Sequence, residues 1–403
     1  MSGERLTAGD GSETLRLGQR HSIATSRRKI ALLITGLLLS LVLIEILCRV
    51  RERVQAHEQL QRFAVPVADS KLGQRMPPNR PDHDARGFRN ATAVASADVV
   101  AIGDSQTWGV NVRREDAWPQ DLARISQQTV YNMSLGGYGP IQYLVLSQEA
   151  LELSPKVVIV AVYLGNDLFD AYSLAYKNDL YAGLRSPSSG GLADDTLTPK
   201  VDELYKEILS ADSIRGPARF FVAHSAILRF LLIPGSEYWY ASAWARSHPD
   251  RFAVYDQGGV KTVLTTGYRL SAVDLGEPRI SEGLKITDRT LAKTQEFMDK
   301  HGVKLLVVLI PTKESIFAGS AMPEHDPTYQ KLLQMETRAR GELIAFCHSN
   351  RIEVFDLLPA LSQAVASGTQ IYPEDTDGHP NAAGYRVLAS AIYDQLRAMH
   401  WVN

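Results

Sequence analysis

The chain has 403 residues, of which 45% are hydrophobic and 22% are charged, and its net charge at pH 7 is −2. This composition is that of a folded globular protein, and it excludes a disordered chain and a collagen-like repeat. The balanced charge gives no sign of nucleic acid as a partner, and none is expected. The two cysteines, Cys48 and Cys347, lie far apart in the sequence, which excludes a disulfide framework and a thiolate zinc site.

The first element in chain order is an apolar segment near the N-terminus. Residues 30–48 follow a basic cluster at 27–29 and contain a single charge, Glu45. As a helix this segment is about 28 Å long, which is close to the thickness of the hydrocarbon layer of a membrane. Because no small-residue cleavage site follows it, we predict an uncleaved membrane anchor rather than a signal peptide or a buried core helix.

The charges around this segment bear on its orientation. Glu45 and Arg49 are four residues apart, so they can pair on one helix face near the membrane interface. The basic residues on the N-terminal side favour a cytoplasmic location for that end by a small margin. We therefore predict a cytoplasmic tail over 1–29, a transmembrane helix over 30–48 and a single-pass protein whose remaining chain is extracytoplasmic, either periplasmic or extracellular.

A polar connector over 49–96 leads into a region, 97–403, in which apolar runs alternate with amphipathic segments. We predict strands within 98–105, 129–134, 156–167, 303–313 and 352–358, and helices over 115–126, 141–153, 327–349 and 382–399. Continuous Val/Ile/Leu runs separated by amphipathic helices are typical of a parallel sheet that is covered on both faces. The stretch 171–298 breaks this alternation, and we predict that it forms a helical insertion with helices near 200–210 and 218–246.

Residues that can carry chemistry follow the predicted strands, and binding sites in α/β folds lie at the carboxyl ends of strands. Ser105 can present its hydroxyl at a strand-to-helix turn, or Asp104 and Ser105 can simply cap a helix. Gly137 lets a backbone N–H approach a developing oxyanion, or it only forms a turn. Asn166 can offer its side-chain amide to the same oxyanion, or it caps the next helix.

His379 lies in a loop before the last predicted helix, near Glu374, Asp375 and Asp377. A histidine beside carboxylates is a candidate general base with an orienting acid. Asp375 can reach the ring only if the loop makes a helical turn, whereas Asp377 is two residues away and Gly378 allows a tight bend. We predict Asp377 as the orienting acid, with Asp375 as the alternative and a purely structural loop as the third interpretation.

Each signal is weak alone, but together and in this order the segments resemble the four blocks of the SGNH/GDSL hydrolase superfamily. The segments are GDSQTWG (103–109), YNMSLGGYGP (131–140), YLGNDLFD (163–170) and YPEDTDGHPNAAGY (372–385). The resemblance covers about 98–170 and 303–400, and the segments 69–79 and 84–90 also look like membrane-anchored bacterial members. It implies the SGNH hydrolase fold, a flavodoxin-like three-layer sandwich with a parallel sheet.

The same resemblance implies a role for each block. Ser105 would be the nucleophile and His379 the base. The oxyanion hole would consist of the Ser105 N–H, the Gly137 N–H and the side-chain amide of Asn166.

Two positions depart from the pattern of the superfamily. Leu164 stands where the third block usually has glycine, and Thr376 stands where the last block usually has aspartate. The acid two residues before the histidine, Asp377, instead resembles the alginate O-acetylation branch, as does the segment PTKESIF (311–317). Lys313 in that segment is therefore a candidate site residue, and the alternative is a solvated loop charge.

These features predict a membrane-anchored serine esterase that hydrolyses acyl esters, O-acetyl esters in particular, and needs no cofactor and no metal. Its expected partners are the ester substrate, which includes an envelope glycan as a candidate, and the lipid bilayer through residues 30–48. The first alternative is an O-acyltransferase that modifies a cell-envelope polysaccharide, and the second is a non-catalytic carbohydrate-binding protein on the same fold. The aromatic run 237–247 is either a sugar-stacking platform or, as is commoner at helical spacing, part of the core.

Overall fold

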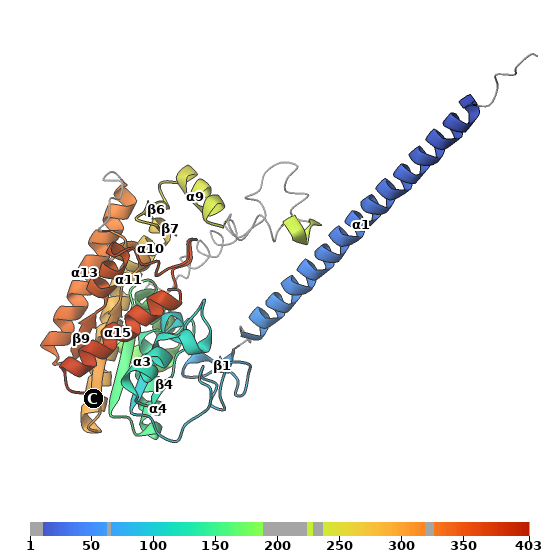
Figure 1. The fold of residues 1–403 in the computed structure, drawn as a ribbon. Coiled ribbons are helices and arrows are strands. Elements are labelled where there is room, and N and C mark those ends of the chain that lie inside the picture. The colour runs from blue at the N-terminus through green and yellow to red at the C-terminus, as the bar shows by residue number, and fades with distance from the viewer. Residues whose placement is uncertain (1–10, 63–65, 188–223, 229–236, 319–325, 403) are drawn as a thin grey trace, which may run out of the picture. The chain divides into compact units, whose positions relative to one another are not determined.

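The computed structural model describes residues 11–62, 66–187, 224–228, 237–318 and 326–402 (Figure 1). The chain divides into two units, of which one comprises 1–59 and 214–234 and the other comprises 60–213 and 235–403. The predicted helix near 200–210 and about half of the one predicted over 218–246 lie outside the described residues.

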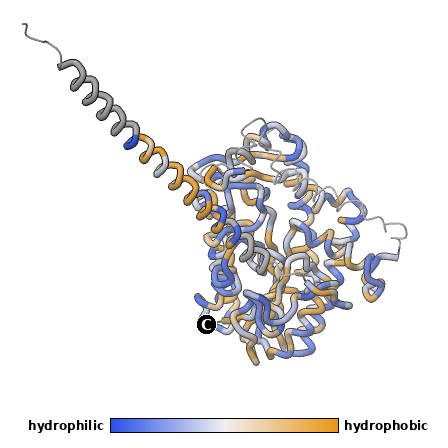
Figure 2. Tube along the Cα trace, turned by 90° about the vertical axis from the view of Figure 1, so that its right-hand side faces the viewer, coloured by the Kyte–Doolittle hydropathy of each residue, from blue (hydrophilic) through white to orange (hydrophobic). Residues whose placement is uncertain are grey.

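The first unit contains all but the last turn of the long helix α1 (Gly11–Arg62). Its residues Arg28–Arg51 have a mean hydropathy of 2.7, and none of the most apolar window is buried. Figure 2 shows this part of α1 as mostly orange, with paler positions between the orange turns. The helix is therefore long and apolar enough to cross a membrane, and its exposure contradicts the alternative of a buried core helix.

The single carboxylate of the apolar segment has partners within this unit. The predicted pair is present, because Nε of Arg49 donates to Oε1 of Glu45 over 2.8 Å. Glu45 also accepts hydrogen bonds from the segment 224–228, whose donors are the Ser225 hydroxyl and the N–H groups of Ala226 and Ile227. Arg49 donates to the carbonyl of His224 over 2.7 Å. These contacts hold that segment against α1.

The second unit is built on a five-stranded sheet in the order β4-β3-β5-β8-β9. Its strands are β3 (Val99–Ile102), β4 (Val130–Asn132), β5 (Val157–Tyr163), β8 (Lys304–Ile310) and β9 (Glu353–Asp356). All four neighbouring pairs are parallel, and β3 and β5 are buried along their whole length. The predicted parallel sheet is confirmed, and its strand order is that of flavodoxin-like folds.

Helices cover both faces of this sheet and complete the predicted three layers. One layer contains α3 (Trp118–Ser126), α14 (Leu358–Ala366) and α15 (Ala382–Ala398), and α15 contacts both of the others. The other layer contains α4 (Pro140–Ala150), α5 (Asp167–Lys177), α11 (Pro278–Lys300) and α13 (Pro327–Ser349). Short 3₁₀ turns follow at η1 (Arg114–Asp116), η2 (Leu151–Leu153) and η3 (Asp179–Leu184).

The stretch predicted as a helical insertion differs from that prediction. It contains α9 (Glu237–Ser247) and α10 (Thr266–Val273), but also an antiparallel hairpin of β6 (Ala253–Gln257) and β7 (Val260–Leu264). The hairpin turns through Gly258 and Gly259, which both have positive φ, as a tight two-residue turn requires. The last part of the stretch is α11, which packs on α4 and α5 as a covering helix of the sheet.

Residues 66–96, predicted as a polar connector, contact the sheet unit closely. They contain the small hairpin of β1 (Val67–Asp69) and β2 (Gly73–Arg75). Arg89 is 1% exposed, pairs with Asp82, and donates to the carbonyls of Trp108, Gly109 and Val112. Its guanidinium also lies 4.1 Å from the centre of the Trp108 ring. This segment is therefore part of the folded unit.

Candidate active site

Ser105 lies at the carboxyl end of β3 and begins the short helix α2 (Ser105–Trp108). The capping role belongs to Asp104, whose Oδ1 accepts a hydrogen bond from the Gln106 N–H over 2.9 Å. The Ser105 side chain is thus not used as the cap. Its Oγ lies 2.9 Å from Nε2 of His379 and 3.3 Å from Oδ2 of Asp104.

His379 joins Ser105 to a carboxylate from its own loop. Nδ1 of His379 lies 2.6 Å from Oδ1 of Asp377, and the His379 backbone N–H donates to the same oxygen over 2.9 Å. Asp375 has a different place, because its Oδ1 accepts the backbone N–H of Asp377 over 2.8 Å. The structure thus places Asp377 against the imidazole, while Asp375 shapes the turn.

The environment of Asp377 keeps it ionised. Burial opposes its ionisation, but hydrogen bonds from His379 and from the side-chain amide of Asn111 outweigh that effect, so the pKa of Asp377 lies well below its usual value. Nδ2 of Asn111 donates to Oδ2 of Asp377 over 2.9 Å. An anionic Asp377 accepts a hydrogen bond from the N–H at Nδ1, so that Nε2 is left as the acceptor for the Ser105 hydroxyl. Sequence analysis missed Asn111, which lies six residues after the serine and shares no motif with the histidine loop.

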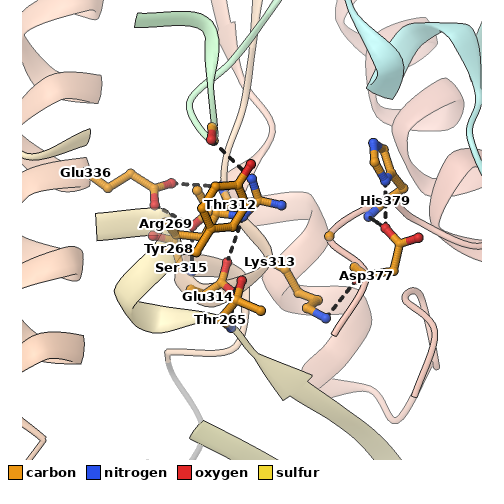
Figure 3. A network of polar contacts seen from close by, with 12 residues as sticks. Thr265, Tyr268, Arg269, Thr312, Lys313, Glu314, Ser315, Glu336, Asp377 and His379 are labelled. Carbon is orange, nitrogen blue, oxygen red and sulfur yellow. Dashed lines mark hydrogen bonds and ion pairs between the residues drawn. The ribbon is translucent and has the colours of Figure 1, made fainter. Parts of the chain in front are cut away.

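Lys313 begins the short helix α12 (Lys313–Ile316) after β8 and has no exposed surface. Its Nζ donates to the carbonyl of Asp377 over 2.8 Å (Figure 3). It also donates to the carbonyl of Asp375 over 3.0 Å and to the hydroxyl of Thr262 over 3.1 Å. Burial lowers the pKa of Lys313 to about 8. The alternative of a solvated loop charge is therefore wrong, and the ammonium faces the backbone of the loop that carries the acid and the histidine.

Gly137 and Asn166 follow β4 and β5, the strands on either side of β3. Gly137 has φ +80°, which favours glycine, and a Cβ built on its neighbour Gly136 would lie 3.7 Å from Cβ of Ser105. The side chain of Asn166 makes no capping bond to α5, and its Nδ2 donates instead to Oδ2 of Asp170 over 2.8 Å. Both residues thus lie at the same sheet edge as Ser105.

Three carboxyl groups gather beneath this edge. Burial raises the pKa of Asp104 to about 6. Burial and the charge of Asp104 together raise the pKa of Asp170 to about 8. The same two causes raise the pKa of Asp167. A proton on Asp170 near neutral pH removes a negative charge from beside the Asn166 amide. The cluster therefore stays compatible with an anion that forms next to Asn166.

The histidine loop is tied to the rest of the fold on two sides. Nε2 of Gln106, next to the serine, donates to the carbonyl of Gly378 over 3.1 Å. On the other side β7 runs along the loop, because the N–H of Val263 donates to the carbonyl of Asp375 and the Thr262 hydroxyl donates to the carbonyl of Pro373. The hairpin of the insertion thus supports the loop that carries His379.

The aromatic run on α9 is used partly for packing. Trp244 lies edge-on to Phe252 with ring centres 4.5 Å apart, and it stacks on His248 at 4.2 Å. The hydroxyl of Tyr238 donates to Asp256. These contacts agree with the core interpretation for both residues, while the side chains of Trp239 and Tyr240 lie outside the described part of the structure.

One family model matches the C-terminal third of the chain. Residues 271–403, which include Lys313, Asp377 and His379, match the family model described as "SGNH hydrolase-like domain, acetyltransferase AlgX". This part of the chain therefore resembles an SGNH hydrolase-like domain of the AlgX type. The resemblance inferred from the sequence is thereby confirmed. A search of curated proteins found no match.

Solved structures that are similar to this chain include two esterases and a lipase. A catalytic mutant of the acetylxylan esterase Axe2 from Geobacillus stearothermophilus is 12% identical, with a TM-score of 0.36, and the match covers 77% of this chain and 98% of that one. An extracellular lipase from Streptomyces rimosus is 11% identical, with a TM-score of 0.38 and coverages of 73% and 100%. The esterase EstA from Pseudoalteromonas is 11% identical, with a TM-score of 0.34 and coverages of 75% and 98%. At such low scores we draw no conclusion about activity from them.

Proposed function

We propose that the protein is a membrane-anchored serine esterase that hydrolyses acyl esters, O-acetyl esters in particular. The observation that carries this proposal is the hydrogen-bonded series from Ser105 Oγ through the His379 ring to Asp377, with distances of 2.9 and 2.6 Å. Serine hydrolases on unrelated folds are recognised by this geometry and not by sequence position.

In this proposal Ser105 is the nucleophile. Its hydroxyl attacks the ester carbonyl while Nε2 of His379 takes the proton, and Asp377 stabilises the imidazolium that forms. The alcohol leaves with the proton from His379, and an acyl-serine remains. A water molecule then attacks the acyl group, gives its proton to His379, and releases the carboxylic acid and free Ser105.

The oxyanion of each tetrahedral intermediate would be held by three donors. They are the backbone N–H groups of Ser105 and Gly137 and the side-chain amide of Asn166, which come from the ends of three adjacent strands. One hydrogen of the Asn166 amide is directed to Asp170, and the other remains for the oxyanion because an amide NH₂ has two.

The second candidate is an O-acyltransferase in which a polysaccharide hydroxyl replaces water in the last step. The matched family model carries the description acetyltransferase, and it covers the acid, the base and Lys313. Transfer requires that water be excluded or that the acceptor be well positioned. A non-catalytic glycan-binding protein is the third candidate, and the intact pairing of Ser105 and His379 argues against it.

The anchor would be the apolar part of α1, Arg28–Arg51. A signal sequence passes the same test of length and hydropathy, but no cleavage site follows the segment. We propose a single-pass membrane protein with the sheet unit outside the cytoplasm, in the periplasm or on the cell surface, where an envelope glycan would be within reach.

A serine-directed phosphonate tests the proposal on the full chain in detergent. Mass spectrometry of the labelled protein should find the adduct on Ser105, and the Ser105→Ala variant should not react. Absence of label on Ser105 under conditions that label a known serine esterase would refute the esterase and the transferase alike. Product analysis with an acyl donor and an envelope glycan then separates the two, because acylated glycan as the main product would favour transfer.

A further inference from the structure

We propose that Gln74, from the hairpin before the sheet, is a positioning residue that aims the Gly137 N–H into the oxyanion hole. The inference rests on the proposed function, since it assumes an oxyanion at this place. It extends that function, because Gln74 lies outside the four blocks and outside the matched family region, and the resemblance of the segment 69–79 gives it no role.

One hydrogen bond carries the argument. Nε2 of Gln74 donates to the carbonyl oxygen of Gly136 over 3.1 Å. The carbonyl of Gly136 and the N–H of Gly137 belong to the same peptide group, which is trans. In a trans peptide these two groups point in opposite directions. A carbonyl held by Gln74 therefore directs the Gly137 N–H away from Gln74.

Ser105 borders this peptide, as the close approach of Gly136 to Cβ of Ser105 indicates. A Cβ built on Gly137 would instead lie 3.3 Å from Nε2 of Gln74. Gly137 has φ +80°, and glycine residues rotate more freely than other residues, so a Gly-Gly peptide can flip. The Gln74 side chain supplies the restraint that two consecutive glycines lack.

The backbone of the hairpin of β1 and β2 is held by several hydrogen bonds, so the position of Gln74 is fixed. The Tyr138 hydroxyl donates to the carbonyl of Gln74 over 2.9 Å. The side chain of Gln142 on α4 donates to the carbonyl of Leu72, and the Tyr181 hydroxyl donates to that of Lys71. These bonds tie the backbone of the hairpin to α4 and to the region after α5.

The hydrogen bond also acts on the strength of the donor. A carbonyl that accepts a hydrogen bond polarises its peptide, so that the N–H on the other side becomes a better donor. Loss of one oxyanion-hole donor costs about 100- to 1000-fold in kcat. If the donor remains but is no longer oriented toward the oxyanion, kcat should fall by part of this factor, on the order of 10- to 100-fold.

The test uses the full-length chain in detergent and a short-chain aryl acetate. Gln74→Leu keeps the size of the side chain but removes the donor. We expect a fall in kcat of about 10- to 100-fold with little change in KM, and an equal slowing of phosphonate labelling at Ser105, because the adduct places an oxygen in the same hole. Tyr181→Phe is the matched control, because it removes a hydrogen bond to the same hairpin without touching Gly136, and it should change kcat less than about twofold.

A second variant supplies a readout that loose packing would not move. Gln74→Glu places a carboxyl group near the Gly136 carbonyl. This carboxyl group cannot donate a hydrogen bond when it is ionised, but it can when it is protonated. The activity of this variant relative to the unmodified chain should therefore rise as the pH falls through the titration of the introduced carboxyl.

The outcomes separate the two proposals. Labelling of Ser105 in the unmodified chain together with unchanged kcat in Gln74→Leu would overturn the role of Gln74 and leave the esterase intact. Equal losses in Gln74→Leu and Tyr181→Phe would also overturn it, because the hairpin would then act only as a scaffold. Failure to label Ser105 in the unmodified chain would remove the esterase and the inference with it.

Discussion

Replacing Lys313 by methionine should lower activity strongly while changing the free energy of unfolding by less than about 2 kcal/mol. Methionine fills a similar volume but offers no donor to the three oxygens that the ammonium contacts, those of Asp377, Asp375 and Thr262. Two of these oxygens keep other partners in the variant. The carbonyl of Asp375 also accepts the N–H of Val263, and the hydroxyl of Thr262 also donates to the carbonyl of Pro373.

Two opposing terms set the change in stability. The pKa of Lys313 is about 8 in the folded chain against the ordinary 10.5, so holding the charge in the fold costs on the order of 3 kcal/mol at neutral pH. Removal of the ammonium also leaves the Asp377 carbonyl without this donor, which costs about 1–3 kcal/mol. The terms nearly cancel, and we expect the free energy of unfolding at pH 7 to change by less than about 2 kcal/mol.

The pH dependence of stability gives an independent check. Below pH 8 both the folded and the unfolded chain hold the proton, and the folded state bears the full cost. Between pH 8 and 10.5 the folded state releases the proton first, so the contribution of Lys313 to stability becomes less unfavourable as the pH rises. The methionine variant should lack this rise, whereas Lys300→Met, a change at an exposed site on α11, should retain it.

Activity should respond differently, because the ammonium fixes the backbone that carries Asp377 and His379. A displacement of about 1 Å in a catalytic group costs on the order of 100-fold, and we expect kcat of Lys313→Met to fall about 10- to 100-fold. Steady-state kinetics and thermal unfolding of both lysine variants measure the two effects. An unchanged kcat would refute the reasoning, and so would a loss of activity that merely follows a collapse in thermal stability.

Three further outcomes are expected. Asp377→Asn should lower kcat by about 1000- to 10,000-fold at similar KM, because the His379 ring loses the acceptor that fixes its tautomer. Asp375→Asn should lower kcat by less than about tenfold. If Asp375→Asn lowers kcat more than Asp377→Asn does, Asp375 is the orienting acid. Arg89→Met should lower the free energy of unfolding by on the order of 3 kcal/mol, because it leaves the buried carbonyls of Trp108, Gly109 and Val112 without their donor and leaves Asp82 with Arg114 as its remaining cation. A loss under about 1 kcal/mol in denaturant unfolding would contradict this. A reporter fused after Asn403 should be active only outside the cytoplasm, and activity only in the cytoplasm would exclude the proposed orientation.

The regular core of the fold could be predicted from the sequence because its signals are local. The predicted helix over 327–349 coincides with α13, and the buried run 156–167 contains β5. Such segments are long and strongly periodic, so tertiary contacts reinforce the local preference. The hairpin of β6 and β7 was missed although its Gly258-Gly259 turn was a usable signal.

The candidate site could be predicted only where the residues form motifs. Ser105, His379 and Asp377 stand in recognisable segments, and the structure brings them within hydrogen-bonding distance. Asn111 and Gln74 act on partners 266 and 62 residues away. The sequence around Asn111 and Gln74 contains no motif that predicts these contacts, because the tertiary fold brings the partners together.

The pairing of β7 with the histidine loop has a consequence for how this protein can vary among relatives. The loop that carries Asp377 and His379 has no regular structure of its own, and the hairpin of the insertion completes it through Thr262 and Val263. Insertions in surface loops are usually gained, lost or exchanged freely during evolution. Here the hairpin and the loop have to be inherited together. A chain that lost the hairpin would keep Ser105 but would lose the contacts that hold the loop of His379 in place. Recombination that exchanges the hairpin should therefore succeed only when the loop from the same parent comes with it.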